Sequence, residues 1–351
     1  MDLRNKILGS LIGSGIGDSM GSVTETYSPN NIIMRHGRPV REYRRSATDN
    51  FSRINWKGAV TDDFSLVYIM CSEIIKNKGV VNDELFEKVL VSWSELPQYF
   101  IQAGPTSRDE ILRIKGAIPK KNPKAHLIAR SDIITNGTSM KSSPMGLINP
   151  GNMDRAIEDT IKMCMPTHPS VLAIATGASV ACAVSEALKD GATKESVVKA
   201  AIDGSRKAYE MAEGIAYPAS GARIDRRIEM AIDIALKYSY DYDKLIEEMT
   251  ETIGTCLVGT ESTAAMFGYF LIAKDPMDLI YLCVNSGGDA DTVATMGGAV
   301  YGALLGADAF EPMHKKSIEE NNFSDKEFKK HFNLDKLADG LTKVAMERSA
   351  K

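Results

Sequence analysis

The chain has few of the residues that mark secreted, metal-cluster or nucleic-acid-binding proteins. Its 351 residues include only five cysteines, which are scattered and never form a C-x-x-C pair. This pattern speaks against a disulfide framework and against a zinc cluster, and it fits a reducing cytoplasm. A basic excess is also lacking, because the formal net charge is -4. We therefore expect no binding to nucleic acid.

Long uninterrupted apolar runs are scarce as well. The N-terminal apolar segment is broken by glycines and carries Asp18, unlike a secretory signal, so no export is expected. One stretch, 163–185, contains no Asp, Glu, Lys or Arg. Pro166, His168 and Pro169 interrupt its first third, and the rest is rich in Ala, Gly and Ser. That composition favours a tightly packed core helix over a membrane span, and we expect a cytoplasmic protein without membrane association.

Strict alternation of apolar and polar residues is rare, and helical spacing dominates. Ser107 and Glu110 have the spacing of a capping box and predict a helix start at that point. No repeat or low-complexity linker marks a domain boundary. We predict one all-α domain over 1–351, in which 306–351 forms a C-terminal helical extension. Apolar residues recur at helical intervals over 3–20, 62–76, 82–93, 171–188, 193–213, 223–238, 241–253, 260–273, 275–285 and 292–305.

A basic segment, 35–57, stands apart from this helical pattern. It carries seven Arg or Lys residues, including Arg53, together with three aromatic residues. A solvated basic loop is the commoner explanation for such a stretch. A phosphate-facing loop or short ribbon becomes the better interpretation if the segment overhangs a functional site.

Two short acidic runs, Thr61-Asp62-Asp63 and Asp289-Ala290-Asp291-Thr292, lie near opposite ends of the chain. Each combines carboxylates with a threonine hydroxyl, an all-oxygen set that suits Mg²⁺ or Mn²⁺. Both fall at predicted helix starts, so each run taken alone could be a helix cap, and for the second run alone the cap is the better interpretation. If the fold brought the four carboxylates together, they would repel one another and would need cations to neutralise them.

Combination with other motifs favours the metal-site interpretation. G-x-x-x-G-D-x-x-G-x-x-x-E covers 13–25, G-x-x-T-D-D covers 58–63 and G-G-D-x-D-T covers 287–292. In this order the motifs resemble the ADP-ribosylglycohydrolase family, which includes dinitrogenase reductase-activating glycohydrolase and the ADP-ribosylhydrolases. The resemblance implies a single compact orthogonal helical domain with a dinuclear metal cleft.

Two segments in the middle of the chain are similar to this family as well. Residues 136–146 resemble its N-G-x-x-M-R-x-x-P-x-G loop, which lines the phosphate and distal-ribose side of the ligand, and Thr167-His168 resembles its T-H pair. The chain departs from the pattern at Lys141, where arginine is usual, and at Phe64, where threonine or serine is common. Lysine keeps the charge but loses the planar fork of arginine, which leaves the substrate subtype open.

The resemblance also assigns roles to individual residues. Glu25 would be the catalytic or gating carboxylate over the metals, with a surface glutamate as the alternative, and Asp62 could share the handling of protons. Asp18 is interpreted as structural, and His168 either touches the ligand or is satisfied within the protein. Two Mg²⁺ or Mn²⁺ ions would be held by Thr61, Asp62, Asp63, Asp289, Asp291 and Thr292. Substrate would be bound by Asn136, Gly137, Thr138, Ser139, Met140, His168, Ser286, Gly287 and Gly288.

The expected function is that of a metal-dependent hydrolase that cleaves the glycosidic bond of an ADP-ribosylated protein or related ADP-ribosyl compound and releases ADP-ribose. Paired cations can bind ribose hydroxyls and lower the pKa of bound water, and carboxylates stabilise the oxocarbenium character of the transition state. Two alternatives stay open: a hydrolase of a small ribosyl metabolite or nucleoside, and a non-catalytic ADP-ribose-binding relative. The partner expected in each case is a compound that contains ribose.

Overall fold

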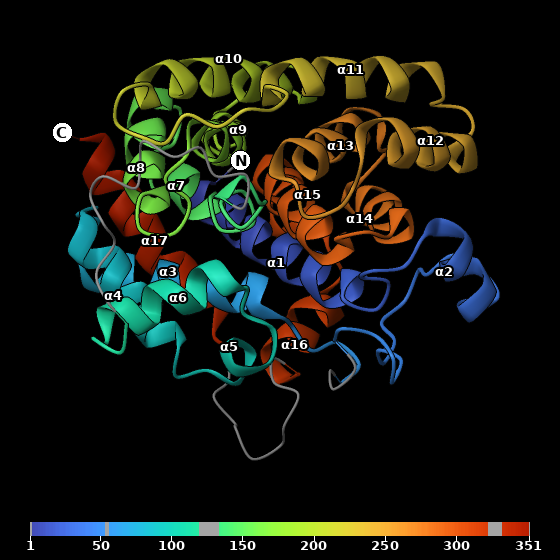
Figure 1. Ribbon diagram of the computed structural model, residues 1–351, viewed down its shortest axis with the longest axis horizontal. Helices are drawn as coiled ribbons and strands as arrows, with labels where there is room; N and C mark the ends of the chain where they lie inside the picture. Colours follow the sequence, from blue (N-terminus) through green and yellow to red (C-terminus); the bar gives the residue numbers. More distant parts are fainter. Residues whose placement is uncertain (1, 53–55, 119–132, 322–331, 351) are drawn as a thin grey trace.

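The computed structural model describes residues 2–52, 56–118, 133–321 and 332–350, and most of these residues lie in helices (Figure 1). Within these ranges there is no β-strand, only isolated bridges between Thr135 and Val258 and between Ser170 and Tyr217. The all-α prediction is therefore confirmed. The helices are α1 (Leu3–Gly21), α2 (Pro29–His36), α3 (Asp62–Lys76), α4 (Asp83–Trp93), α5 (Pro97–Gln102), α6 (Pro105–Ile114), α7 (Ser143–Leu147), α8 (Met153–Cys164), α9 (Val171–Ala187), α10 (Lys194–Ala212), α11 (Ile224–Lys237), α12 (Tyr242–Glu248), α13 (Gly259–Ile272), α14 (Pro276–Ser286), α15 (Ala290–Leu305), α16 (Pro312–Glu320) and α17 (Leu334–Ser349).

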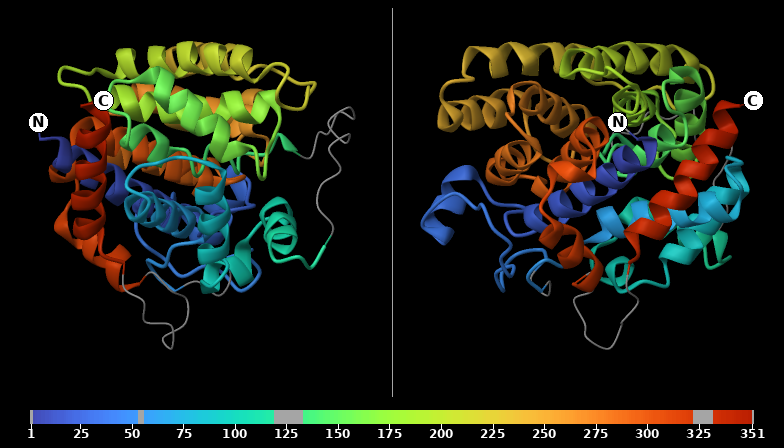
Figure 2. Two further views of the ribbon diagram at one scale, coloured as in Figure 1. Left: turned by 90° about the vertical axis from the view of Figure 1, so that its left-hand side faces the viewer. Right: turned by 180° about the vertical axis from the view of Figure 1, so that it is seen from behind.

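The centre of the fold is the contact between α1 and α15, which come from opposite ends of the chain (Figures 1 and 2). Gly9, Gly13, Gly17 and Gly21 recur every four residues and so form one face of α1. A Cβ added at Gly13 would lie 2.7 Å from the carbonyl carbon of Gly298, and one at Gly17 would lie 2.7 Å from the backbone nitrogen of Thr295. Because glycine has no Cβ, the two backbones can approach this closely.

The uncharged stretch 163–185 divides between the end of α8 and the helix α9. Every residue of α9 except Glu186 is buried, and the helix packs against α7, α8, α10 and α15. This confirms the prediction of a core helix. None of the described helices is both long enough and apolar enough to cross a bilayer.

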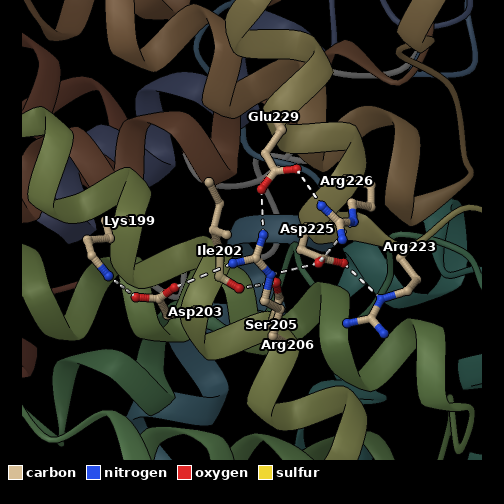
Figure 3. Close-up of polar contacts among 9 residues, drawn as sticks. All are labelled: Lys199, Ile202, Asp203, Ser205, Arg206, Arg223, Asp225, Arg226 and Glu229. Atoms are coloured by element: carbon tan, nitrogen blue, oxygen red, sulfur yellow. Dashed lines mark hydrogen bonds and ion pairs between the residues drawn. The ribbon is translucent and has the colours of Figure 1, made fainter.

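Two long helices, α10 and α11, run along one edge of the molecule and are joined by ion pairs (Figures 1 and 3). Arg206 of α10 donates to Asp225 at 2.9 Å and to Glu229 at 2.5 Å, and Arg223 donates to Asp225 at 3.0 Å. Burial opposes ionisation of Asp225, but the two arginines hold its pKa below the ordinary value. These contacts fasten α10 to α11 near the start of α11.

Most predicted helices are present with their ends shifted by one or two residues. The capping box at Ser107 and Glu110 is wrong, because α6 begins earlier, at Pro105, whose fixed φ suits the first helical position. The helix predicted over 241–253 divides into α12 and a π-helical turn, Met249–Ile253. Several helices were not predicted individually, namely α2, α5, α7, α8, α16 and α17. Of these, α17 packs against α1 and α3.

Candidate functional site

The N-terminal turn of α3 carries the first acidic run and is held by Asp18 of α1. One carboxylate oxygen of Asp18 accepts from the Thr61 hydroxyl at 2.5 Å. The other accepts from the backbone N–H groups of Thr61 and Phe64 at 2.8 and 3.1 Å. Asp18 is fully buried, and burial raises its pKa to about 6. Asp18 therefore fixes the helix start from which Asp62 and Asp63 project.

The second acidic run is held against the segment that follows α1. The Thr26 N–H donates to the Gly288 carbonyl at 2.6 Å, and the Gly288 N–H donates to the Tyr27 carbonyl at 2.9 Å. Gly287 and Gly288 both have φ of +66°, and a Cβ at Gly288 would lie 2.6 Å from the Thr255 carbonyl oxygen. Both positions thus require glycine. Thr26 itself has φ of +69°, an unusual conformation for a β-branched residue.

These two attachments bring the acidic runs and Glu25 together. Glu25, Asp289 and Asp291 each offer a carboxylate oxygen within 4.8 Å of the others, an arrangement able to hold a metal ion. The side chain of Thr292 lies close enough to Asp63 to act on the pKa of its carboxyl, which places the first run beside the second. One oxygen of Asp63, Oδ2, is buried and has no hydrogen-bond partner among the described residues.

Helix capping does not explain the second run. Asp289 occupies the N-cap position of α15, yet its side chain makes no capping hydrogen bond to the first turn. It accepts instead from the Asn136 side-chain amide, which belongs to the predicted substrate loop. Among the backbone donors of the described residues, Asp291 accepts from the N–H of its neighbour Thr292, at 3.1 Å. At the first run, Thr61 is a true cap and accepts from the Asp63 N–H at 3.3 Å.

The electrostatics of the cluster favour positive counter-charge. Burial, followed by the charges of Asp289 and Asp62, raises the pKa of Glu25 well above its ordinary value. Burial and neighbouring carboxylates do the same for Asp62, Asp63 and Asp291. Such a group must either take up protons or bind cations. The donors are all oxygens, so the side chains present fit a hard divalent cation.

The predicted substrate loop lies against the same cluster, through Asn136. Its hydroxyl side chains are directed to protein partners: Thr138 donates to the Ala173 carbonyl at 2.9 Å, and Ser139 donates to the Asn136 carbonyl at 2.9 Å. Ser286 likewise is fully buried and lies 2.6 Å from the Tyr269 hydroxyl. Met140 is half-buried against the core.

His168 and Lys141 form a polar network beneath this loop. The two ring nitrogens of His168 each lie 2.9 Å from a threonine hydroxyl, that of Thr135 and that of Thr167. The Lys141 ammonium donates to Thr167 at 2.8 Å and is buried. The ring of His168 also lies against Gly137, where a Cβ would be 2.9 Å from Cε1. The network supports the loop from inside the protein.

Sequence reasoning missed the residues that hold Glu25. The basic segment 35–57 contacts the acidic site through two neutral side chains, those of Asn50 and Ser52. Asn50 donates to the Glu25 carbonyl at 3.0 Å, and Ser52 donates to the Glu25 carboxylate at 3.1 Å. Arg35 is paired with Asp49, and Arg53 lies outside the described residues. No motif marks Asn50 or Ser52.

Comparison with known proteins agrees with this geometry. The family model for ADP-ribosylglycohydrolases matches residues 1–350. The chain belongs to the ADP-ribosylglycohydrolase family. As a member of this family it is related to glycosidic-bond hydrolases, and its carboxylate cluster joins two of the motif segments, 13–25 and 287–292.

Individual relatives cover nearly the whole chain. The uncharacterized protein YegU of Escherichia coli is 27% identical over 350 residues, which are 98% of each chain. An uncharacterized protein of Archaeoglobus fulgidus is 23% identical over 303 residues, 86% of this chain and 88% of the relative. A solved structure described as an ADP-ribosylglycohydrolase-related protein complex superposes with a TM-score of 0.66 at 19% identity, covering 98% of this chain and 99% of that one. This likeness shows that the ADP-ribosylglycohydrolase fold is shared.

Proposed function

We propose that the protein is a metal-dependent hydrolase that cleaves the glycosidic bond of an ADP-ribosylated protein or related ADP-ribosyl compound and releases ADP-ribose. The observation that carries the proposal is the convergence of Glu25, Asp289 and Asp291, from opposite ends of the chain, within 4.8 Å of one another. A purely structural role does not account for it, because buried like charges destabilise the fold. Membership of the family supplies the class of reaction.

The residues that would hold two Mg²⁺ or Mn²⁺ ions are Thr61, Asp62, Asp63, Asp289, Asp291 and Thr292. When bound, the cations supply positive charge for ribose hydroxyls and lower the pKa of bound water. The buried oxygen of Asp63 that lacks a partner supports this assignment. Asn136 holds Asp289 in place through its side-chain amide.

The protein's own groups account for the remaining requirements of glycosidic cleavage. Glu25, whose pKa is raised by burial and by the neighbouring carboxylates, would hold or move a proton at its carboxylate oxygens, and Asp62 is the second group able to do so. The surrounding carboxylates stabilise positive charge that develops on the ribose. Because the hydroxyls of Thr138 and Ser139 have protein partners, the loop would offer a diphosphate its backbone N–H groups.

The decisive experiment compares near-isosteric variants of aspartates inside and outside the acidic cluster. Purified wild type, Asp62→Asn, Asp291→Asn and the control Asp225→Asn are incubated with protein ADP-ribosylated on arginine or on serine, in Mg²⁺, in Mn²⁺ and in EDTA. Free ADP-ribose is measured by chromatography. We expect the rate of ADP-ribose release to fall at least about 100-fold in Asp62→Asn, in Asp291→Asn and in EDTA. Even substitutions of residues that only contact metal ligands lower metal affinity or activity by about 10–100-fold. Asp225→Asn, which alters only the ion pairs of Figure 3, should keep its activity.

The same assay separates the remaining candidates. Nucleosides and small ribosyl metabolites are offered under identical metal conditions, and calorimetry measures binding of ADP-ribose. Turnover of nucleosides alone would transfer the proposal to that substrate class. Binding of ADP-ribose without any turnover by the metal-loaded wild type would refute the hydrolase assignment.

A further inference from the structure

The carboxylate of Glu25 is held by a chain of two neutral side chains from separate segments. The Ser52 hydroxyl donates to Glu25 Oε2 at 3.1 Å, and the Gln102 side-chain amide donates to Ser52 Oγ at 2.9 Å. Ser52 follows α2, and Gln102 is the last residue of α5. Both are buried, with 0% and 4% of their surface exposed. These two hydrogen-bonded side chains therefore reach Glu25 from inside the protein.

Hydrogen-bond chemistry fixes which group donates and which accepts in these two successive hydrogen bonds. The single hydroxyl proton of Ser52 is directed to Glu25 Oε2, so the Ser52 oxygen is left to accept from another group. The amide nitrogen of Gln102 is the donor that faces it. The backbone of the same turn is also fixed, because the Ser52 N–H donates to Asn50 Oδ1 at 2.7 Å while the Asn50 amide holds the Glu25 carbonyl.

Gln102 is itself held in position by an arginine. Arg108 of α6 donates to the carbonyls of Ala103, Tyr99 and Phe100 at 2.7, 3.1 and 2.9 Å, which satisfies the C-terminal end of α5. Its guanidinium also lies 5.4 Å from the centre of the Tyr99 ring. These contacts fix the C-terminal end of α5, and Gln102 extends from this end toward Ser52.

Glu25 needs such support because its surroundings repel it. Its carboxylate lies within 4.8 Å of those of Asp289 and Asp291, and the like charges favour a rotamer that points away. Among the described residues, the Ser52 hydroxyl is the side-chain donor to this carboxylate. Without it, Glu25 would be free to leave the cluster.

We propose that Ser52 and Gln102 are positioning residues that set the orientation of the Glu25 carboxylate in the acidic cluster. Their effect on catalysis rests on the proposed function, whereas their effect on the geometry of Glu25 does not. Gln102 acts through Ser52, so removal of both side chains should cost no more than removal of the Ser52 hydroxyl alone.

The kinetic test uses Ser52→Ala, Gln102→Ala, the double variant, the conservative Ser52→Thr and the control Ser46→Ala. Ser46 lies in the same segment and is buried, but its hydroxyl faces the Ser22 carbonyl. We expect Ser52→Ala to lower kcat about tenfold with little change in KM, as for other residues that orient a reacting group. Ser52→Thr should restore most of the rate, and the double variant should match Ser52→Ala. Multiplicative losses in the double variant, or an equal loss in Ser46→Ala, would overturn the proposal.

The structural test needs no turnover. Crystal structures of wild type and Ser52→Ala are compared at the Glu25 side chain. We expect one ordered carboxylate in the wild type and a displaced or divided one in Ser52→Ala. An unchanged Glu25 position in the variant overturns the positioning role. If the wild type releases no ADP-ribose, the proposed function fails, but this comparison still decides whether Ser52 orients Glu25.

Discussion

Replacement of Gly13 by alanine should separate α1 from α15 and weaken the acidic cluster at their ends. A matched control is available on the same helix. The Cβ of alanine at position 13 would lie 2.7 Å from the carbonyl carbon of Gly298, which belongs to a buried helix backbone. At Gly15 the nearest atom is Cδ1 of the Ile318 side chain, at 2.9 Å, which can rotate away.

The sizes of the competing effects set the expected result. Non-bonded carbons prefer a separation of about 3.5–4.0 Å, so the backbones at position 13 must move apart by about 1 Å. Overpacking of this kind costs about 1–3 kcal/mol, whereas replacing glycine by alanine within a helix gains about 1 kcal/mol. Gly13→Ala should therefore lose up to about 2 kcal/mol of stability. Gly15→Ala should lose little or gain slightly.

Urea unfolding of the two variants measures the difference, and calorimetric titration with Mn²⁺ measures the effect on the site. Gly21, at the end of the same glycine face, lies directly against the backbone of Asp291. A displacement of α1 should therefore weaken Mn²⁺ binding in Gly13→Ala but not in Gly15→Ala. Equal stability and equal Mn²⁺ affinity in the two variants would refute the idea that this close approach builds the site.

Three further predictions concern the site. Thr26→Gly should stabilise the protein by about 1 kcal/mol in urea unfolding, because glycine accommodates φ of +69° without strain; a loss of stability would contradict this. Asp18→Asn should cost about 2–3 kcal/mol and weaken Mn²⁺ binding, because an amide cannot accept from all three donors that now reach Asp18; unchanged Mn²⁺ affinity would argue against its role at α3. The metal-free protein should become more stable as pH falls from 7.5 to 5.5, because carboxylates with raised folded-state pKa values, about 6 for Asp18, bind protons that the unfolded chain does not. A lower Tm in EDTA at pH 5.5 than at pH 7.5 would contradict the predicted proton uptake. Mn²⁺ affinity should fall over the same pH range, because protons compete with the cation for the carboxylates.

The sequence allowed the prediction of the helices and of the acidic runs because both depend on local patterns. Asp62 begins α3 and Ala290 begins α15, within two residues of the predicted starts. The four-residue spacing of glycines in α1 was visible, but only the structure identifies α15 as its partner. The expectation that Glu25, Asp289 and Asp291 converge came from the motif resemblance. Periodicity could not supply it, because no local signal encodes contacts between remote segments.

The support of the site was not predictable from the sequence. Ser52 and Gln102 are common residue types in segments without a motif. They can orient Glu25 only because the fold places Gln102 against Ser52 and Ser52 against Glu25. The short helices α2 and α5 lack enough turns to show a periodic pattern. At α6 the proline at position 105 decided the helix start, although Ser107 offered a plausible capping residue.

The contact between α1 and α15 also determines when the site can exist during synthesis. Glu25 leaves the ribosome early, but its partners Asp289 and Asp291 are made more than 260 residues later. Until α15 emerges, the glycine face of α1 has no α15 backbone to pack against, and the proposed metal ligands are divided between finished and unfinished parts of the chain. The acidic cluster therefore cannot form before residues 289–291 have been made.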